Sequence, residues 1–535
     1  MPYDTVMTEH KVKFLPSGRI VLVQDGETIS QAARKAGVHI NASCGGSGLC
    51  GKCRVLLESG TIEGGKSEKL TEQDYASGIR QACLSDIKSD LVIRIPQESV
   101  LDTGVLDTAV PVRHKAGMYV FDIEQLKEEG IFASPVDKLF LELSRPSSTY
   151  SIADAGRLIK GLADQYDERG MVVELQVLRR LRRILREDDF RVTVTLSRSV
   201  RRRFRTRVVN IQAGNWTYRN FGLAVDIGTT TVYGQLLDLN TGQVLAEAGD
   251  YNAQMSYGED VISRIIQAER PGGLGLMQSL VVSTINGIIE KLLDSCGVSR
   301  DEISSITLAG NTTMTHLFLG LEPHNIRRSP YVPVSTFFPP IRARDDLGLD
   351  LERHAVALVF PAVSSYVGGD IVAGIMGSGM YRTDAQTLLI DIGTNAEIVI
   401  GNREWLACAA CSAGPAFEGG GITHGMRVSS GAIEDFSLNP QSLEPMNITI
   451  GNKSPKGICG SGLLIIVATL FEHGIIDQQG KFNRGLKTPR IRQGEAAMSM
   501  CLRGKTRFKG NQISSLMKQT LTTLFVPRQR STRGL

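Results

Sequence analysis

Apolar and polar residues alternate in several short stretches near the start of the chain. KVKFLP (residues 11–16) and RIVLVQ (19–24) each predict a strand, and so does LVIRIP (91–96). Between them, SQAARKAGV (30–38) predicts a short helix with Ser30 as its N-cap. We therefore expect the first hundred residues to form a small mixed unit of strands and one helix.

A longer apolar pattern occurs twice. LAVDIGTTTVYGQLLDLNTGQVLAEAG starts at Leu223, and LLIDIGTNAEIVIGNREWLACAACSAG starts at Leu388. Each copy has an apolar strand that ends at an aspartate (Asp226 or Asp391), a tight Gly-Thr turn, a second strand, a short turn and a third strand. The repeat predicts two related three-stranded meanders, and hence a duplicated domain.

The region between these landmarks is less regular. Residues 97–125 show weak periodicity and predict a linker. Residues 126–212 alternate helix-like and strand-like patterns and predict a small α/β domain, in which Ser151 is expected to cap a helix. The longest apolar run, at residues 462–471, is too short to span a bilayer.

Four cysteines give the most specific chemical signal. Their spacing, C-x5-C-x2-C-x29-C, is close to the plant-type ferredoxin pattern for a [2Fe–2S] cluster. Glycines at 45, 46, 48 and 51 would let the loop curl around sulfur and direct backbone N–H groups toward it. The alternatives are a zinc knuckle or buried free thiols, but zinc sites prefer paired C-x2-C knuckles. The predicted cluster ligands are Cys44, Cys50, Cys53 and Cys83.

Composition narrows the class of protein. The chain has 535 residues, 42% of them hydrophobic, and a net charge of +4, which is too small to indicate nucleic-acid binding. Nine cysteines in a chain whose N-terminus has no apolar core fit a reducing cytoplasm and no secretory signal. The chain is long enough for about three or four domains.

Positive charge is concentrated in one region. Twelve arginines lie between Arg179 and Arg207. A solvated helix face and strand edge is the plainer interpretation, and a docking patch for an acidic protein partner is the alternative. Nucleic acid is less favoured because few aromatic residues interleave with the arginines.

The two Gly-Thr turns are suited to a nucleotide. Such a turn can present backbone N–H groups and hydroxyls to a phosphate, while the preceding aspartate holds Mg²⁺ directly or through water. A third Gly-rich turn, at residues 457–462, opens an apolar helix and could bind an anion, although helix starts also carry glycine for packing.

Other polar residues allow a weaker interpretation. We expect Asn311 and Thr312 to face the cleft, and His316 to be a packing histidine. Asp370 and Glu418 are candidates for contact with the site. Buried thiols are a better interpretation than a second metal site for three further cysteines: Cys408, Cys411 and Cys459.

The duplicated pattern resembles the actin-like ATPase superfamily, in which two lobes clamp ATP–Mg²⁺. The resemblance implies that Asp226 and Asp391 are the catalytic carboxylates. The nucleotide-binding residues that it implies are Gly228, Thr229 and Thr230 in the first loop, Gly393, Thr394 and Asn395 in the second, and Gly460, Ser461 and Gly462 in the third.

The whole set of motifs resembles the reductive activators of corrinoid proteins. The strings that carry the match are CGGSGLCGKCRV, DIGTTTV, AGNTTMTHL, DIGTNAEI, SAGPAFEGGGI and GICGSGL. The expected fold class is a mixed α/β and α+β multidomain chain. The expected parts are a ferredoxin-like β-grasp domain at 1–98, a linker at 97–125, a small α/β middle domain at 126–212, and a duplicated RNase H-like ATPase domain with lobes at 220–380 and 385–496.

The resemblance also implies the activity. An electron from the [2Fe–2S] cluster would reduce cobalt(II) of a corrinoid protein in a methyltransferase system to cobalt(I), with ATP and Mg²⁺ making the uphill step possible. An external low-potential donor would recharge the cluster. No nucleic acid or membrane is expected as a partner, and a homodimer is left open. The alternatives are an ATP-driven electron donor for another metalloenzyme, or a redox adaptor with an inactive ATPase.

The end of the sequence departs from the family pattern. Residues after about 496 have no clear amphipathic period and end in an arginine-rich tail. Reading allowed codons one base out of register converts ISSLMKQTLTTLFVPRQRSTRGL into a strongly helical string. We therefore expect a frameshifted tail at 497–535, an incomplete second lobe, and weak ATP binding or none, so that hydrolysis by this chain is uncertain.

Overall fold

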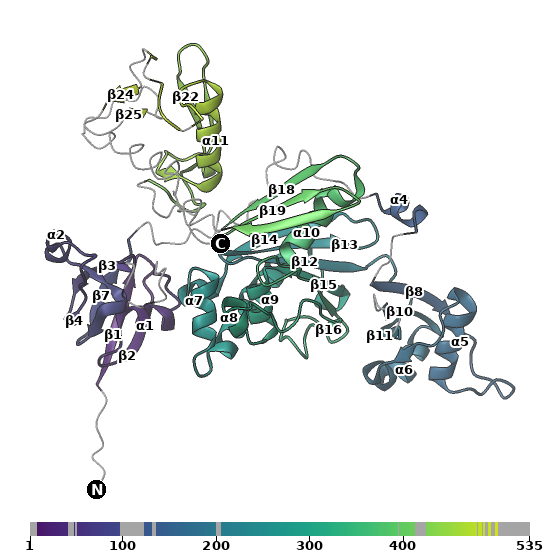
Figure 1. The fold of residues 1–535 in the computed structure, drawn as a ribbon. Coiled ribbons are helices and arrows are strands. Elements are labelled where there is room, and N and C mark those ends of the chain that lie inside the picture. The colour runs from purple at the N-terminus through teal and green to yellow at the C-terminus, as the bar shows by residue number, and fades with distance from the viewer. Residues whose placement is uncertain are drawn as a thin grey trace, which may run out of the picture. The chain divides into compact units, whose positions relative to one another are not determined.

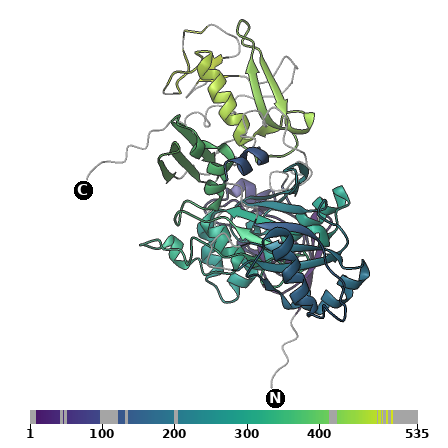
Figure 2. The ribbon, with the colours of Figure 1, turned by 90° about the vertical axis from the view of Figure 1, so that its right-hand side faces the viewer.

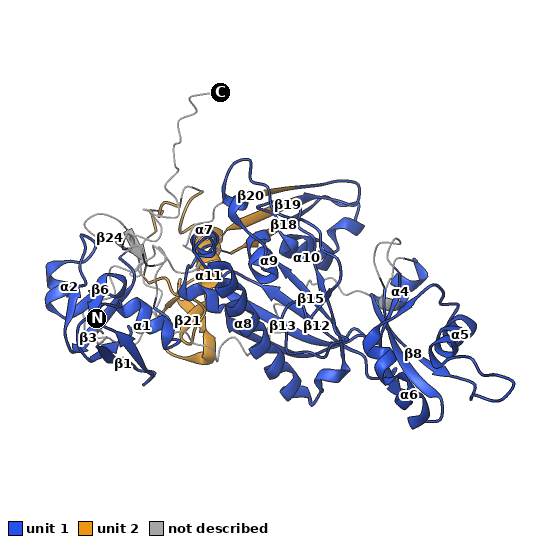
Figure 3. Cartoon of the chain, turned by 90° about the horizontal axis from the view of Figure 1, so that it is seen from below, with its two compact units in different colours: residues 1–99, 107–389, 400–407 blue, residues 100–106, 390–399, 408–535 orange. Residues whose placement is uncertain are grey.

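The computed structural model gives the chain as two compact units, shown in different colours in Figure 3. One comprises residues 1–99, 107–389 and 400–407, and the other comprises residues 100–106, 390–399 and 408–535. The residues that the structure describes are 8–40, 46, 48, 51–96, 122–130, 135–198, 205–393, 395–411, 424–478, 480–483, 485–486, 491–493 and 498–500.

The first domain is a mixed five-stranded sheet crossed by one helix (Figure 1). The sheet has the order β2-β1-β7-β3-β5; β1 pairs antiparallel with β2 and parallel with β7. The buried side chains of Val12, Phe14, Ile29, Val55 and Ile93 form its core. The elements are β1 (Glu9–Leu15), β2 (Ile20–Gln24), α1 (Ile29–Lys35), β3 (Arg54–Ser59), β4 (Ile62–Gly64), α2 (Glu72–Ala76), β5 (Ile79–Gln81), η1 (Ala82–Leu84), β6 (Ser85–Ile87) and β7 (Leu91–Arg94).

The helix α1 begins two residues earlier than the sequence predicts. Thr28, not Ser30, is its N-cap: the Thr28 hydroxyl accepts a hydrogen bond from the Gln31 backbone at 3.1 Å, and the Gln31 side chain accepts one from the Thr28 backbone at 2.7 Å. This reciprocal pair satisfies two backbone donors at once, which a Ser30 cap would leave unpaired. The prediction of Ser30 as the cap was therefore wrong.

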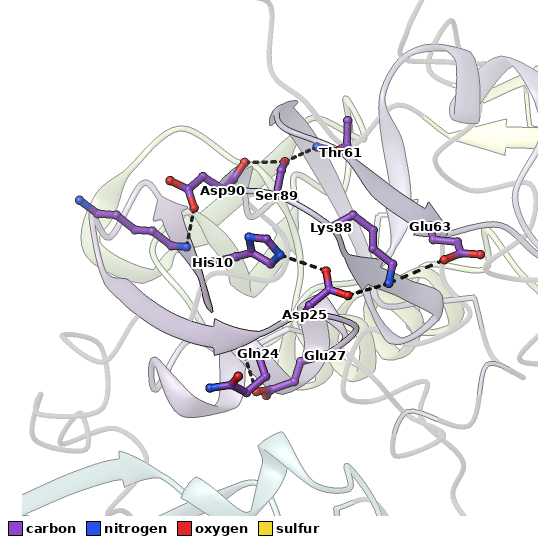
Figure 4. Close-up of polar contacts among 10 residues, drawn as sticks. His10, Gln24, Asp25, Glu27, Thr61, Glu63, Lys88, Ser89 and Asp90 are labelled. Carbon is purple, nitrogen blue, oxygen red and sulfur yellow. Dashed lines mark hydrogen bonds and ion pairs between the residues drawn. The ribbon is translucent and has the colours of Figure 1, made fainter. Parts of the chain in front are cut away.

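Polar contacts fasten the β1–β2 hairpin to the strands that follow (Figure 4). The Asp25 carboxylate accepts hydrogen bonds from His10 Nε2 at 3.0 Å and from Lys88 Nζ at 3.1 Å. The hydrogen bond from His10, followed by that from Lys88, lowers the pKa of Asp25. Beside them the Thr61 backbone donates to the Ser89 hydroxyl at 2.8 Å. The Lys88–Asp25 contact ties the end of β2 to the segment between β6 and β7.

The next domain is a four-stranded sheet in the order β8-β10-β11-β9, with α5 and α6 packed on it. Leu158, Leu162, Val177, Leu181, Ile184 and Leu185 are the buried helical residues of its core. Ser151 is not a helix cap: α5 begins after Ala153, which makes no side-chain cap bond. The elements from α4 onward are α4 (Ile123–Glu128), β8 (Val136–Glu142), α5 (Asp154–Tyr166), β9 (Val172–Val173), α6 (Leu175–Glu187), β10 (Arg191–Ser197) and β11 (Arg207–Ala213).

Helix α6 carries part of the arginine cluster on its exposed side. Arg183 pairs with Glu187 at 2.9 Å, and Arg186 pairs with Asp154 at 2.8 Å. The buried positions Val177, Leu181, Ile184 and Leu185 point the other way, into the core. These ion pairs fit the interpretation of a solvated helix face.

The first meander lies within a six-stranded sheet in the order β14-β13-β12-β15-β17-β16. The strand β12 is central: it pairs antiparallel with β13 and parallel with β15. The elements of this part are β12 (Phe221–Ile227), β13 (Thr231–Asp238), β14 (Val244–Tyr251), η4 (Ala253–Ser256), α7 (Val261–Ala268), α8 (Gly273–Cys296), η5 (Arg300–Glu302), β15 (Ile303–Gly310), α9 (Thr312–Leu319), η6 (His324–Arg327), β16 (Ile341–Arg342), β17 (Val356–Val359), α10 (Gly369–Ser378) and η7 (Met380–Arg382).

Helix α8 is long and apolar enough, by length and composition, to cross a membrane. Its buried residues Met277, Val281, Ile285, Ile288 and Leu292 instead share one core with the strands of the six-stranded sheet. Half of its most apolar 18-residue stretch is buried inside the protein. We therefore assign α8 as the core helix of this domain.

The second meander repeats the pattern with strands β18 (Thr387–Ile392), β19 (Ala396–Gly401) and β20 (Leu406–Cys411), in that order in the sheet. Two predicted meanders are thus confirmed. The chain continues through β21 (Ala432–Leu438), β22 (Pro445–Thr449), η9 (Ile450–Asn452), β23 (Gly457–Ile458) and α11 (Gly460–Glu472), which packs on β21 (Figures 1 and 2).

The last described elements are two short strands, β24 (Ile491–Gln493) and β25 (Met498–Met500), which pair antiparallel. The rest of the predicted frameshifted tail lies outside the described residues. So do Glu418 and residues 97–121 of the predicted linker, whose last residues begin α4.

Two of the three thiols predicted to be buried are exposed. Cys459 is buried, whereas Cys408 and Cys411 on β20 are exposed. The alternation of β20 places both cysteines on strand faces that nothing in the described residues covers, so the prediction was wrong for these two.

Packing of α11 on β21 gives a test of this part of the fold. A Cβ atom at Gly462 would collide with the backbone of Ile433, lying 2.8 Å from its carbonyl carbon. We expect Gly462→Ala to destabilise the protein by about 1–3 kcal/mol. In Gly287→Ala, a matched change in α8, the new methyl group meets no atom within 4 Å, and the better helix former should stabilise by up to about 1 kcal/mol. Thermal unfolding followed by circular dichroism measures both; equal midpoints would contradict the packing.

Candidate functional site

Two of the predicted cluster ligands lie together in the core of the first domain. Cys53 directly precedes β3, and Cys83 lies in η1 between β5 and β6. Their Sγ atoms are 3.2 Å apart, and both residues are buried. The two sulfur atoms are too far apart for a disulfide, whose S–S distance is about 2.05 Å, and they converge as a ligand pair would. Cys44 and Cys50 lie outside the described residues, and the four-ligand assignment stays a prediction.

The loop that carries the cysteines needs glycine at several points. Gly46, Gly48 and Gly51 have φ angles of +91°, +81° and +70°, a region that side chains with a Cβ atom rarely adopt. Space is also short, because a Cβ atom at Gly51 would lie 2.6 Å from Lys69 Cβ. A curled loop against two buried thiols fits a [2Fe–2S] cluster, which such a loop could hold with its cysteines.

The first predicted nucleotide loop, Gly228–Thr230, connects β12 to β13 directly after Asp226. Gly228 has no room for a side chain, because a Cβ atom there would collide with the Thr231 carbonyl oxygen. Asn252 fixes the loop from outside: its side-chain amide donates to the Gly228 carbonyl at 2.9 Å, and its backbone N–H donates to the Thr230 carbonyl at 2.9 Å. These two bonds fix two carbonyl groups of the loop in position.

A buried arginine on α7 holds the same loop. Arg264 is fully buried, and its guanidinium donates to the Thr229 carbonyl, to the Gly258 carbonyl at 2.8 Å and to Gln254 Oε1 at 3.1 Å. Hydrogen bonds from a charged group to oxygen atoms in a buried setting are strong. Sequence analysis did not single out Arg264 or Asn252, because neither belongs to a repeated motif or a Gly-rich turn.

Helix α9 contacts the loop through its N-cap. The side-chain oxygen of Asn311 accepts from the Met314 backbone at 2.9 Å, and its amide nitrogen donates to Thr229 Oγ1 at 3.0 Å. Asn311 thus joins a helix start to the predicted phosphate loop. Next to it, a Cβ atom at Gly368 would lie 2.7 Å from the Thr312 backbone nitrogen, so the start of α10 presses on the start of α9.

The predicted packing histidine is confirmed. His316 is fully buried; its Nδ1 lies 2.7 Å from the Thr312 carbonyl, and its Nε2 accepts from the Val334 backbone at 3.1 Å. Both ring nitrogens are occupied by backbone groups, and burial lowers the pKa of His316. The imidazole is therefore neutral and structural.

The second predicted loop follows β18. The Gly393 backbone N–H donates to the Asn395 carbonyl at 2.8 Å, which closes a tight turn directly after Asp391. Desolvation raises the pKa of the Asp391 carboxyl. Thr394 lies outside the described residues. Asp226 and Asp391 belong to different units, so a single cleft lined by both stays a prediction.

The third predicted loop starts α11. Its N-cap, Cys459, makes no side-chain cap bond to the helix, and its thiol instead lies 3.1 Å from the Ile433 carbonyl. The Ser461 hydroxyl is 3.3 Å from the same thiol. Since Gly462 is required where α11 meets β21, packing accounts for one glycine of the motif, and anion binding by Gly460 and Ser461 stays a prediction.

Comparison with protein families matches four consecutive parts of the chain. A 2Fe-2S iron-sulfur cluster binding domain matches residues 12–88, and the RACo linker region matches 125–218. The RACo middle region matches 221–383, and the C-terminal domain of RACo, described as the ASKHA domain, matches 385–522. This last match extends past residue 496.

Individual proteins match over most of the chain. A solved structure of a reductive activator for corrinoid, iron-sulfur protein is 41% identical, with 92% of this chain and 77% of that chain covered and a TM-score of 0.61. The corrinoid activation enzyme RamQ of Eubacterium limosum is 27% identical over 470 residues, covering 86% of this chain and 71% of its own. The [Co(II) methylated amine-specific corrinoid protein] reductase of Methanosarcina barkeri is 23% identical, with 50% and 53% covered.

An iron–sulfur domain joined to an ASKHA region defines a class of ATP-using redox proteins. Within that class, the chain belongs to the family of reductive activators of corrinoid proteins. The expected [2Fe–2S] cluster, ATP use and multidomain fold class are thereby confirmed.

The cluster assignment can be tested on single cysteines. We expect Cys83→Ala to abolish the visible absorption of the cluster and to lower the iron content, because the cluster loses a thiolate ligand. Cys296→Ala removes a half-buried thiol at the end of α8 and should leave the spectrum unchanged. An intact spectrum in Cys83→Ala would show that Cys83 is not a ligand.

Two substitutions of Asn311 distinguish its role as the cap of α9 from its role in positioning the loop. Asn311→Asp keeps an oxygen acceptor for the Met314 backbone but removes the N–H that reaches Thr229, so we expect weaker ATP binding at nearly unchanged stability. Asn311→Ala should weaken binding and also cost about 1 kcal/mol of stability through loss of the cap. Calorimetric titration with ATP–Mg²⁺ and thermal unfolding measure the two effects. Equal ATP affinity in Asn311→Asp and the unaltered chain would contradict a positioning effect of the amide.

Proposed function

We propose that this protein reactivates a corrinoid protein by passing one electron to cobalt(II), which regenerates cobalt(I), and that ATP makes this transfer possible. The observation that carries the proposal is the combination, in one chain, of a [2Fe–2S] domain with RACo linker, middle and ASKHA regions. A ferredoxin-like domain alone would carry electrons without indicating their acceptor. The attached RACo regions supply that indication, as does the 41% identity to a reductive activator for corrinoid, iron-sulfur protein over 92% of this chain.

The predicted functional residues form two sites, one for the cluster and one for the nucleotide. Cys44, Cys50, Cys53 and Cys83 would hold the cluster, which supplies single electrons when bound. Four thiolate ligands around two irons leave no open coordination position, so this site would exchange electrons and bind no substrate. The buried pair Cys53 and Cys83 supports this assignment.

At the nucleotide site, Asp226 and Asp391 would hold Mg²⁺, directly or through water. The turns after them would place backbone N–H groups and the hydroxyls of Thr229, Thr230 and Thr394 against phosphate oxygens. Asn252 and Arg264 hold the first turn in position through its carbonyl groups. A preformed turn binds phosphate without first having to be ordered.

ATP is needed because the electron moves uphill. Plant-type clusters have potentials near −400 mV, and the cobalt(II)/cobalt(I) couple is expected to lie lower. Binding and hydrolysis of ATP can shift the equilibrium only if ATP has different affinities for two conformations of the activator–corrinoid complex. The ATP site and the corrinoid-binding surface must therefore be coupled.

The remaining partners follow from this chemistry. We propose that the partner is a corrinoid protein of a methyltransferase system and that it binds the ATPase lobes. The ferredoxin domain, tethered by the linker, would then deliver the electron from its cluster. An external low-potential donor would reduce the cluster again. We place the protein in the cytoplasm, without contact to nucleic acid or a membrane, and leave a homodimer as an option for solution measurement.

Absorption spectroscopy tests this function directly. A cobalt(II) corrinoid protein, encoded near the gene for this chain, is mixed anaerobically with the reduced protein, with and without ATP–Mg²⁺. Appearance of the cobalt(I) spectrum only with ATP supports the proposal. Reduction at equal rates without ATP indicates a redox adaptor with an inactive ATPase. No cobalt(I) under either condition, with the cluster intact, indicates an electron donor for another metalloenzyme.

The aspartate of the first loop should carry the ATP dependence. We expect Asp226→Asn to lower the ATP-dependent rate of cobalt(I) formation by roughly 10- to 100-fold, since it weakens the hold on Mg²⁺. The cluster spectrum should not change. Asp294→Asn, an exposed position on α8, is the control and should retain the rate. An unaltered rate in Asp226→Asn would show that Asp226 does not hold Mg²⁺ for this reaction.

A further inference from the structure

Two polar side chains beside the cluster loop carry buried nitrogen atoms without a hydrogen-bond partner. They are Nε2 of Gln81 and Nε of Arg34. The Gln81 side chain is fully buried, and its Oε1 is unpartnered as well. Buried polar groups are nearly always paired, because an unpaired one loses its bonds to water and gains nothing in return. Such groups next to a site for a bound cofactor indicate that the cofactor supplies the partner.

The backbone places Gln81 close in the chain or across the sheet to the two described cysteines. Gln81 is the last residue of β5, two positions before Cys83, and it pairs across the sheet with Arg54, the neighbour of Cys53. Its backbone N–H donates to the Gly65 carbonyl at 3.0 Å. The side-chain Nε2 lies 3.7 Å from the position that a Cβ atom of Gly51 would occupy. The amide nitrogen thus lies beside Gly51, between the predicted ligands Cys50 and Cys53 in the sequence.

Arg34 approaches the same loop from α1. Its Nη2 atom lies 3.0 Å from the position of a Cβ atom at Gly46, and that position is 3.9 Å from Cys83 Cβ. The same nitrogen donates to the Ser30 hydroxyl at 3.3 Å, which fixes the guanidinium on the helix. The guanidinium carbon of Arg34 also lies 5.0 Å from the centroid of the Tyr257 ring. Burial lowers the pKa of Arg34, and Tyr257 and then Cys83 act in the opposite direction. Gly46 therefore lies between the guanidinium of Arg34 and Cys83, a predicted cluster ligand.

We propose that Gln81 and Arg34 donate N–H hydrogen bonds to sulfur atoms of the [2Fe–2S] cluster and thereby raise its reduction potential. Reduction adds one electron and no proton to the cluster. The added negative charge makes its sulfur atoms better acceptors, so N–H donors stabilise the reduced form more than the oxidised form. The proposal rests on the cluster of the proposed function, and it assigns to these residues a part beyond holding the loop.

The proposal predicts opposite effects on the two half-reactions. Removing a donor lowers the potential, so the reduced cluster becomes a stronger reductant for cobalt(II). The same change makes the cluster harder to reduce by an external donor. Gln81 and Arg34 would then set the compromise between accepting an electron and passing it on.

Spectroelectrochemical titration of the full chain with its cluster tests this. We expect Gln81→Met and Arg34→Gln each to shift the reduction equilibrium about tenfold toward the oxidised form, which for a one-electron couple is 59 mV. Lys35→Gln is the control for Arg34: it removes the same charge from the next residue of α1, whose ammonium pairs with Glu27 at 2.7 Å. Gln73→Met is the control for Gln81: it makes the same substitution at an exposed position of α2. Both controls should keep the original potential.

An unchanged potential in Gln81→Met and Arg34→Gln, with the cluster spectrum intact, would overturn the proposal. Equal shifts in Arg34→Gln and Lys35→Gln would also overturn it for Arg34, because a general charge effect would then explain the shift. If a variant loses its cluster, pulsed EPR of the reduced unaltered chain decides, with ¹⁵N placed in the side chains of glutamine or arginine. Hyperfine coupling from those nitrogens supports the bonds, and its absence contradicts them. Loss of ATP-dependent corrinoid reduction alone would bear on the proposed function and not on these bonds.

Discussion

The first ATPase lobe depends on one buried cation. Arg264 has no contact with solvent, and its guanidinium is satisfied by the Thr229 and Gly258 carbonyl groups and by Gln254. A buried charge without such partners would cost several kcal/mol, so the predicted phosphate loop, the turn before α7 and η4 must be arranged around it together. Asn252 and Asn311 add bonds to the same loop from two further elements. The loop is thus shaped by the lobe before any nucleotide arrives.

In the ferredoxin-like domain the cluster site and the hydrophobic core are one region. Cys53 and Cys83 are buried in the same hydrophobic core as Val12, Ile29 and Val55. Metal bound by these predicted ligands would therefore be coupled to the stability of the fold.

Sequence patterns predicted the parts of this protein whose signals repeat or are spaced regularly. The two Asp-Gly-Thr meanders and the cysteine loop are of this kind, and they led to the fold class and the family. Caps were predicted less well: Thr28 and Ser30 are both good N-cap residues, and only the reciprocal bond with Gln31 decides between them. Arg264 and Asn252 were missed because their importance comes from tertiary contacts with a loop more than twenty residues away. Cys408 and Cys411 were misplaced because an apolar neighbourhood in sequence does not ensure a cover in space.

The contact between Gly368 and the start of α9 has a mechanical consequence. With no side chain at Gly368, the backbone at the start of α10 lies directly on Asn311 and Thr312, while Asn311 holds Thr229. The predicted phosphate loop, α9 and the first turn of α10 are therefore joined by direct contacts. At the far end of α10, about 15 Å along the helix given the 1.5 Å rise of each residue, the chain turns at Gly379, which adopts a φ of +68°. A residue with a Cβ atom is disfavoured in that conformation, so glycine is needed at both ends of α10, for close packing at one end and for the turn at the other.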